Sequence, residues 1–270
     1  MLTIKNNIMA ENASRHLGQS YGALARSVER LSSGLRINSA KDDAAGLAVR
    51  ELMRADIAVL KQGTRNANDG ISMLQTMEGA MATINNALIR MKELAEQAST
   101  GSYSDMQRNI MDNEFKEMAA EIDRIANSTE FNSIKMLNSD ASANAATIHF
   151  GVGQEITVNS VDVRSSALGL GSASIATAAN AQSALSLVHT AIEEKDSARA
   201  MFGYMMNRLE STTEVLGIQT ENMMAAESRV SDVDVATEMA ALTRNQVLSQ
   251  AGVSMLAQAN MMPQMALSLL

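Results

Sequence analysis

The chain contains no cysteine and no tryptophan, a single proline, and so few aromatic residues that they make up 3% of its 270 positions. Without cysteine it can form no disulfide and offers no thiolate as a nucleophile or metal ligand. The scarcity of aromatic side chains argues against the thick core of a β-sandwich or an α/β enzyme. Because the one proline, Pro263, lies near the end, almost the whole chain is free to be helical.

Signals for catalysis, cofactors, nucleic acid and membranes are also sparse. His16, His149 and His189 have no second histidine at ligand spacing, so we expect no metal site. Gly151 and Gly153 precede strand-like residues and indicate a turn rather than a nucleotide loop, so we expect no cofactor. The net charge of −8 disfavours nucleic acid. No apolar run reaches the roughly 18 residues of a membrane span, and the N-terminus lacks the apolar core of a cleaved signal peptide. We therefore expect neither an enzyme nor a membrane protein.

What the chain has in abundance is helical periodicity. Apolar residues recur at alternating spacings of three and four across residues 185–230, as in a coiled-coil seam. At about 1.5 Å per residue this helix is roughly 69 Å long, which requires an equally long partner. A second helix is expected over residues 43–99, loosened near Gly63 and Gly70, with a seam at residues 77–98. We expect this helix to be the partner.

Shorter elements complete the expected plan. A third helix covers residues 104–128, and residues 147–158 alternate as in a β-hairpin with a glycine turn. The first helix, residues 4–31, and a last helix capped by Ser231 carry apolar residues that a lone molecule would expose. The expected fold class is therefore mainly α: a long antiparallel helical bundle or coiled-coil rod with one small β-hairpin region.

Polar and charged residues add detail to this plan. Residues 1–65 carry a net charge of +4 and the remainder −12, so the basic first helix can lie against an acidic C-terminal one, or both can be solvated faces. Polar side chains in a seam fix helix register at some cost in stability. We expect that role, or contacts with neighbouring subunits, for the four polar residues of the long seam, Lys195, Arg199, Thr212 and Gln219.

Three stretches near the two ends match a known pattern. Residues 31–49, LSSGLRINSAKDDAAGLAV, and residues 65–79, RNANDGISMLQTMEG, resemble the N-terminal region of bacterial flagellins. SRVSDVDVATEMAALTRNQVLSQAGVSMLAQAN, from Ser228, and the closing LSLL are similar to the C-terminal region. By this resemblance the chain is identified as a bacterial flagellin, in a short form without large outer domains. Hook-filament junction proteins share the general plan, match these motifs less well, and are the alternative.

The resemblance implies a place for each segment in a filament. Residues 1–33 and 235–270 would form the paired terminal helices of the inner tube. Residues 34–43 would be a spoke connector, and residues 44–234 an outer rod that includes the β-hairpin. No separate variable outer domain is expected. The implied function is that of a structural subunit, outside the cell, which polymerises into the flagellar filament for swimming motility.

The resemblance also implies partners. Besides copies of the chain itself in a helical homopolymer, they are the flagellar export apparatus, a flagellin chaperone, the filament cap and the hook-filament junction proteins. Terminal helices that cannot bury their apolar stripes alone would order as they join neighbours, which couples folding to assembly. The residues expected to act in self-assembly are Ile4, Ile8, Leu17, Leu24, Leu31, Leu242, Val247, Leu256 and Leu269.

One further partner is implied residue by residue. Flagellins that Toll-like receptor 5 recognises present an Arg, a Leu and a Glu on their second and third helices, and Arg90, Leu94 and Glu114 stand at the matching positions. An exposed Arg beside a Glu suits bidentate hydrogen bonding, and a Leu knob can fill a pocket. The other interpretation is that these residues serve packing between subunits.

Overall fold

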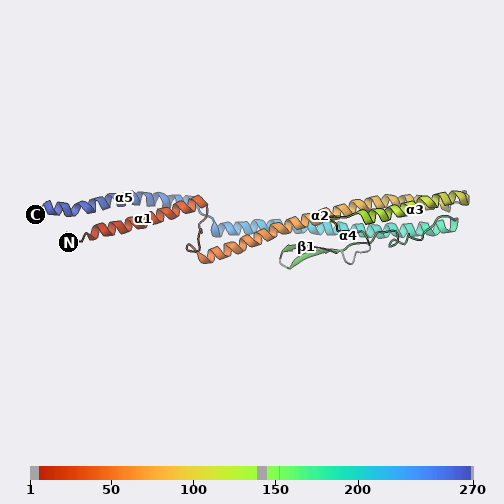
Figure 1. Cartoon of the computed structure of the whole chain (residues 1–270), viewed down its shortest axis with the longest axis horizontal. Coiled ribbons are helices and arrows are strands. Elements are labelled where there is room, and N and C mark those ends of the chain that lie inside the picture. The colour runs from red at the N-terminus through yellow and green to blue at the C-terminus, as the bar shows by residue number, and fades with distance from the viewer. Residues whose placement is uncertain (1–5, 139–144, 152, 269–270) are drawn as a thin grey trace. The chain divides into compact units, whose positions relative to one another are not determined.

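The computed structural model describes residues 6–138, 145–151 and 153–268. These residues form five α-helices and one two-stranded antiparallel sheet (Figure 1), which confirms the expected, mainly α fold class. In chain order the elements are α1 (Ile8–Ser33), α2 (Ala44–Ser99), α3 (Asp105–Ser128), β1 (Ala146–Gly151), β2 (Gln154–Val158), α4 (Ala178–Ser231) and α5 (Val235–Ser268).

The chain divides into two compact units. The terminal unit comprises Met1–Ile57 and Glu221–Leu270, and so contains α1, α5, the start of α2 and the end of α4. The central unit is Ala58–Thr220, with the remainder of α2 and α4, all of α3, and the hairpin. Because both boundaries fall inside continuous helices, α2 and α4 contribute to both units.

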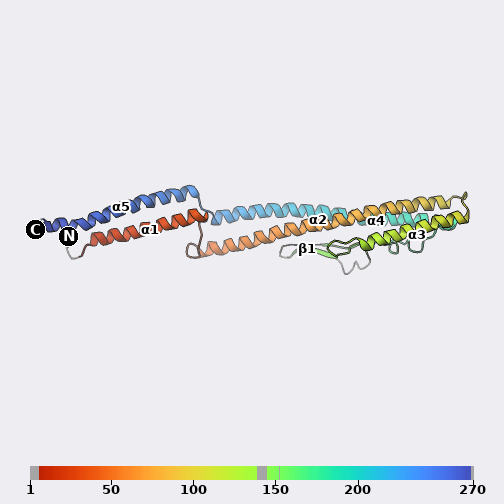
Figure 2. The same cartoon turned by 45° about the horizontal axis from the view of Figure 1, so that its top comes forward.

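The central unit is an antiparallel helical bundle. Its parts of α2 and α4 lie side by side in both Figure 1 and Figure 2. Glu78 contacts Arg199 and Asn85 contacts Lys195, so residue numbers rise along α2 as they fall along α4. One continuous apolar core joins α2, α3, α4 and the hairpin, as their heptad spacing predicts. Fully buried members include Met77, Met81, Ile84, Leu88, Met91, Phe115, Ile122, Val188, Phe202 and Leu209.

The hairpin packs directly on the backbone of α2. In its register Ile148 pairs with Ile156, and both side chains are buried. A Cβ at Gly63 would meet the carbonyl oxygen of Phe150 and lie 2.9 Å from its Cα, while one at Gly70 would meet the end of Ile148. The expected loosening of this helix is wrong, because α2 runs unbroken through both glycines. At both glycines the hairpin leaves no room for a side chain.

Local polar contacts set several helix ends. Ser104 and Gln107 form a reciprocal capping box at the start of α3. Asp234 accepts hydrogen bonds from the amide of Ala236 and the hydroxyl of Thr237 at the start of α5. These bonds, led by that from the Thr237 hydroxyl, lower the pKa of Asp234. The expectation that Ser231 caps the last helix is wrong, because α4 continues to that residue.

Candidate functional site

The terminal helices α1 and α5 form an antiparallel pair (Figure 1). The Asn7 side chain donates to the carbonyl of Ala259 at one end, and Ser27 donates to Glu238 at the other. The inward-facing positions recur at spacings of three and four along both helices, and many of them hold small residues. In α1 they are Ala10, Ala13, Leu17, Ser20, Leu24 and Ser27, and in α5 they are Glu238, Leu242, Asn245, Ser249, Gly252, Leu256 and Ala259. Small seam residues let two helices approach closely and bury little apolar area.

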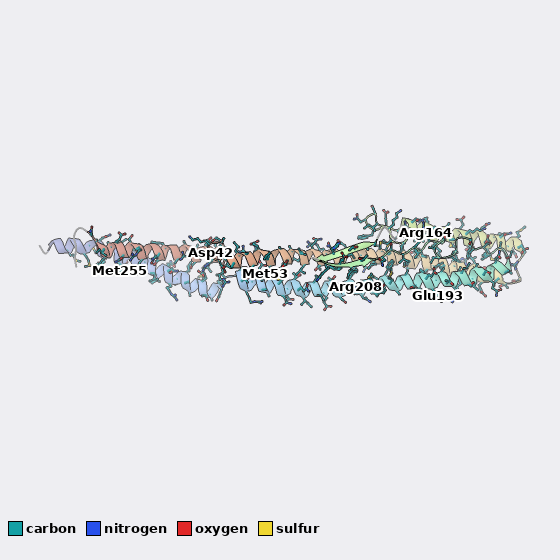
Figure 3. All side chains as sticks on the ribbon, turned by 90° about the horizontal axis from the view of Figure 1, so that it is seen from below. Asp42, Met53, Arg164, Glu193, Arg208 and Met255 are labelled. Atoms are coloured by element: carbon teal, nitrogen blue, oxygen red, sulfur yellow. The ribbon has the colours of Figure 1, made fainter. Side chains whose placement is uncertain are left out.

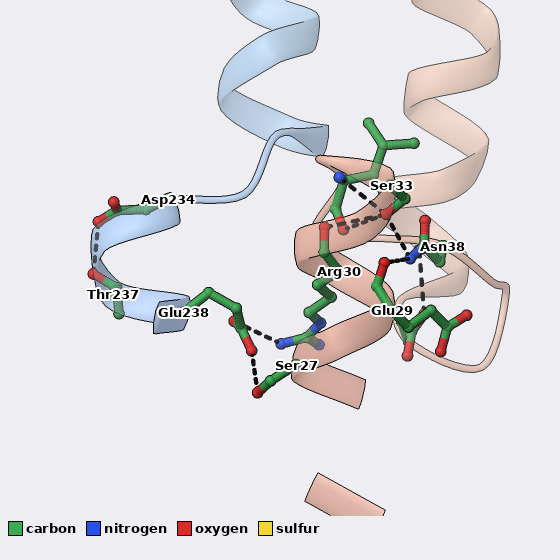
Figure 4. Close-up of polar contacts among 10 residues, drawn as sticks. Ser27, Glu29, Arg30, Ser33, Asn38, Asp234, Thr237 and Glu238 are labelled. Atoms are coloured by element: carbon green, nitrogen blue, oxygen red, sulfur yellow. Dashed lines mark hydrogen bonds and ion pairs between the residues drawn. The ribbon is translucent and has the colours of Figure 1, made fainter. Parts of the chain in front are cut away.

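Glu238 is the polar anchor of this pair (Figure 4). Its carboxylate accepts a 2.6 Å hydrogen bond from the Ser27 hydroxyl and lies 3.6 Å from the guanidinium of Arg30. Ser27 is the one buried residue among those described in α1. The contact joins a base of the N-terminal helix to an acid of the C-terminal helix, although α5 itself carries one acid, Glu238, and one base, Arg244.

The connector between α1 and α2 is held by specific polar contacts (Figure 4). Gly34 ends α1 with a left-handed φ of 73°. The Asn38 side chain then donates to the Ser33 hydroxyl, 2.8 Å away. Asp42 accepts from the amide and hydroxyl of Ser39, and these bonds lower the pKa of Asp42. The connector is therefore an ordered turn rather than a slack linker.

Main-chain contacts also tie this connector to the end of α4 within the terminal unit. The amide of Arg36 donates to the carbonyl of Ser231, and its guanidinium donates to the carbonyl of Val230. The amide of Val233 donates back to Gly34. The connector and the end of α4, almost two hundred residues apart in sequence, are thus hydrogen-bonded to each other.

The free faces of the terminal pair carry exposed apolar residues among polar ones. Val247 is 58% exposed and Met255 is 64% exposed. Single exposed apolar residues are ordinary, but a helix pair with them on both helices and several faces indicates an association surface. The exposed apolar residues described in α1 and α5 are Ile8, Met9, Tyr21, Val28, Val235, Met239, Val247, Leu248, Val253, Met255, Met261 and Met265.

The residues expected to act in self-assembly fall into three groups. Leu17, Leu24, Leu31, Leu242 and Leu256 are half-buried, so they serve in part to join α1 to α5. Ile8 and Val247 are exposed and available to another molecule. Ile4 and Leu269 lie outside the described residues. Tyr21, Val28, Leu248 and Met255 are exposed on the same two helices. The apolar pattern of the sequence includes the last three, whereas Tyr21 was missed.

Arg90 and Glu114 form an exposed ion pair between α2 and α3 in the central unit. The Arg90 Nε donates to Glu114 at 2.8 Å, and a terminal nitrogen of Arg90 lies 2.7 Å from the same oxygen. The hydrogen bond that Arg90 donates to Glu114 raises the pKa of Arg90, and the one that it donates to Glu93 raises it further. Leu94 is 2% exposed, so the expectation of a protruding Leu knob is wrong: this side chain fills the core beneath the pair. Ile89 and Ile110, which sequence reasoning missed, supply exposed apolar surface on the same two helices.

The polar residues of the long seam behave differently from one another. The Lys195 side chain is 1% exposed, and its ammonium donates to the Asn85 side chain at 2.7 Å and pairs with Asp196. Arg199 pairs with Glu78 at the surface. Thr212 donates to a carbonyl of its own helix, and Gln219 is exposed.

Two carboxylates of α3 bind the segment that leads into α4. Asp123 accepts hydrogen bonds from both the amide and the hydroxyl of Ser165, each 2.7 Å long. Asp112 Oδ1 accepts from the Ser174 hydroxyl and the Ile175 amide, and its other oxygen pairs with Lys116. These groups satisfy backbone donors and leave little carboxylate capacity for acid-base chemistry.

The described residues show no group of three or more His, Asp or Glu side chains placed to hold a metal ion. Among the described helices, none combines the length and apolar content needed to cross a membrane.

Comparison with known proteins points to one family. A model of the bacterial flagellin N-terminal helical region matches residues 4–143, and a model of the C-terminal helical region matches residues 185–270. A flagellin from Halalkalibacterium halodurans is 41% identical over 271 residues, with all of both chains covered. A flagellin from Bacillus subtilis strain 168 is 39% identical over 303 residues, again with both chains fully covered.

Solved structures give the same architecture. The crystal structure of Bacillus cereus flagellin aligns with a TM-score of 0.51 and 30% identity, covering 60% of this chain and 94% of that one. A putative flagellar hook-associated protein from Vibrio parahaemolyticus aligns with a TM-score of 0.59, covering 71% of this chain and 100% of the other. Its identity is 14%, so this second likeness shows a shared fold alone.

Proposed function

The chain belongs to the bacterial flagellin family, and we propose that it polymerises through the free apolar faces of its terminal helices. It is a structural subunit of the flagellar filament, the extracellular appendage of motility. Full-length identity to flagellins favours this function over that of a hook-filament junction protein. The observation that supports the mode of polymerisation is the exposed apolar surface on α1 and α5, which a neighbouring subunit can bury.

We place the segments in the filament as follows. Residues 1–33 and 235–270 form the inner tube, residues 34–43 are the spoke, and residues 44–234 are the outer rod. The apolar exposure of α1 and α5 supports an inner position, because surfaces of that kind are stable only when covered. The ordered connector supports a spoke of fixed geometry.

A substitution on α5 tests this mode of polymerisation. Replacing Val247 by Glu puts a charge where the neighbouring subunit is expected, and loses the roughly 1.5–3 kcal/mol that burying a Val contributes. The critical concentration for polymerisation, measured by sedimentation and electron microscopy, should rise at least about tenfold. Gln250→Glu adds the same charge at an exposed polar position of the same helix and should have a much smaller effect. Equal critical concentrations for V247E and the unmodified chain would refute the proposal.

Folding of the terminal pair is coupled to assembly in this proposal. Its seam is rich in Ala, Ser and Gly, so α1 and α5 gain less from each other than the central helices do from their core. We also propose that subunits pass through the flagellar export apparatus, with a chaperone covering apolar segments beforehand, and join the filament between the cap and the junction proteins. Limited proteolysis should trim both ends of the monomer and spare them in the filament. Ends that resist protease in both states would contradict coupled folding.

A second proposal concerns recognition by Toll-like receptor 5. The exposed Arg90 and Glu114 pair supports it, because such a pair can exchange its internal hydrogen bonds for bonds to a receptor. Buried Leu94 acts from beneath by holding α2 against the core. In a receptor reporter assay, replacing Arg90 and Glu114 together by Ala should reduce signalling while the melting temperature changes little. Leu94→Ala should lower the melting temperature as well, by creating a cavity that costs about 2–5 kcal/mol. Unchanged signalling by the double variant would refute this proposal.

A further inference from the structure

Two groups of methionines in this chain differ sharply in exposure. Met77, Met81 and Met91 are 0% exposed in the core of the central unit, whereas Met239, 47% exposed, lies on α5. Also on α5 are Met255, labelled in Figure 3, and Met261, which is 49% exposed. We propose that these three exposed methionines are oxidation sites, and that their reversible conversion to sulfoxide controls whether the subunit polymerises. This inference rests on the proposed role of the α5 surface in assembly.

The reaction requires a peroxide as its oxidant. The thioether sulfur attacks one oxygen of hydrogen peroxide, the O–O bond breaks, and an S–O bond forms. Sulfur loses two electrons, the peroxide is reduced, and its second oxygen leaves as water with both protons. A thiol-dependent methionine sulfoxide reductase reverses the change, forming water and a disulfide on the reductant. Because the chain lacks cysteine, the peroxide has no thiol to attack first.

Exposure determines which methionines react. A sulfur inside the close-packed core is shielded from peroxide as long as the central unit stays folded. Met239, Met255 and Met261 are open to solvent in the free subunit, so their oxidation needs no unfolding. In the filament the proposed contacts would cover them, and the newly made subunit is then the vulnerable form.

Oxidation changes the chemistry of the surface that assembly must bury. Met255 lines a groove of about 670 Å³ between α1 and α5, together with Leu248, Ala251 and His16. A sulfoxide is polar and strongly hydrated, so it costs little while exposed and much when a neighbouring subunit removes its water. The free subunit should therefore keep its fold while its polymer is destabilised. Each covered sulfoxide should raise the critical concentration about tenfold.

The test compares oxidised and untreated protein. Monomer is treated with hydrogen peroxide, the sites are mapped by peptide mass spectrometry, and the critical concentration is measured by sedimentation. We expect Met239, Met255 and Met261 to react before Met77, with circular dichroism unchanged and polymerisation weakened. Treatment with methionine sulfoxide reductase and dithiothreitol should restore polymerisation. A failure of the untreated protein to polymerise would refute the proposed function instead.

Substitutions locate the effect. The triple variant M239L/M255L/M261L, compared with its own untreated sample, should be clearly less sensitive to peroxide than the unmodified chain. The variant still contains the exposed Met9 and Met265 of the same helix pair. Met106 of α3 is 76% exposed and reacts as readily, so Met106→Leu should leave that sensitivity in place. If oxidised protein polymerises as well as untreated protein, the inference is wrong. It is also wrong if Met106→Leu alone protects polymerisation from peroxide, or if the reductase restores no polymerisation. If the triple variant does not polymerise, the reductase experiment on the unmodified chain tests the inference instead.

Discussion

Replacing Asp112 by Ala should weaken the central unit more than any single change at its surface. Asp112 Oδ1 accepts 2.8 Å and 2.7 Å hydrogen bonds from the Ser174 hydroxyl and the Ile175 amide, and Oδ2 lies 2.6 Å from the Lys116 ammonium. The Asp112 side chain is 5% exposed and Ile175 is 0% exposed. This carboxylate therefore substitutes for a backbone acceptor just before α4 begins.

The size of the effect follows from what each donor does once the carboxylate is gone. The buried Ile175 amide would have no acceptor in reach, which costs about 1–3 kcal/mol. Lys116 is mostly exposed, so losing its ion pair costs at most about 1 kcal/mol. The Ser174 hydroxyl can rotate towards water. The sum is a loss of about 1–4 kcal/mol in the free energy of unfolding of the central unit.

Urea unfolding of the full chain, followed by circular dichroism, measures this loss. With a slope of about 2 kcal/mol per molar urea, the midpoint of D112A should fall by about 0.5–2 M. Asp112→Asn keeps an oxygen that can accept from both Ser174 and Ile175, so it should cost only about 1 kcal/mol. Glu117→Ala removes an exposed acid of the same helix and is the matched control. A midpoint for D112A no lower than that for E117A would refute the reasoning.

The same carboxylate should make stability depend on pH. Burial would raise the pKa of Asp112, but hydrogen bonds from Lys116, Ile175 and Ser174 outweigh burial and lower it below the ordinary 3.8. A lowered pKa in the folded state means that the ionised group stabilises above about pH 4, and that this stabilisation is lost as pH falls through the folded pKa. The difference in stability between the unmodified chain and D112N should therefore be full at neutral pH and shrink in acid.

Two other predictions concern the central unit. Gly63→Ala should displace the hairpin from α2, speed amide hydrogen exchange in residues 146–158 and lower the free energy of unfolding by about 1–3 kcal/mol. In the control, Gly79→Ala, the new Cβ meets open space and should stabilise α2 by up to about 1 kcal/mol. Equal effects of the two substitutions would contradict the argument that the hairpin approaches closely at Gly63. Lys195→Ala should lower the melting temperature, because the cavity that it leaves costs about 2–4 kcal/mol. Lys195→Met fills the same space and should change the free energy of unfolding by less than about 1.5 kcal/mol. A similar loss for both variants would mean that the charge of Lys195, rather than its packed volume, stabilises the unit.

The long helices could be predicted because their signal is repeated many times. In α2 and α4 a spacing of three and four persists over many heptads, so single exceptions such as Lys195 do not erase it. The hairpin was predictable from its alternation and glycine turn. Both patterns can be read from neighbouring residues alone, because each one only requires that one face of the helix or strand be buried.

Contacts between distant segments could not be predicted in this way. Helix propensity describes Gly63 and Gly70 as weak points, because the sequence does not reveal that a strand more than seventy residues later lies against them. Leu94 lies next to charged residues in the sequence, yet the helix turns it into the core. Asp112 gave no sequence signal, since its importance comes from a backbone amide sixty-three positions away.

In the terminal unit, the seam between α1 and α5 and the outer faces of the two helices have different roles. Leu17 lies 3.1 Å from where a Cβ on Gly252 would be, so α1 and α5 approach closely with little side-chain volume between them. Such a seam sets the geometry of the pair but contributes little stability, because buried apolar area is small. Further apolar residues, such as Val28 and Val247, lie on the outside of the pair. In the proposed filament neighbouring subunits would cover them, so the same arrangement would give a weakly stable free end and a strongly held assembled end.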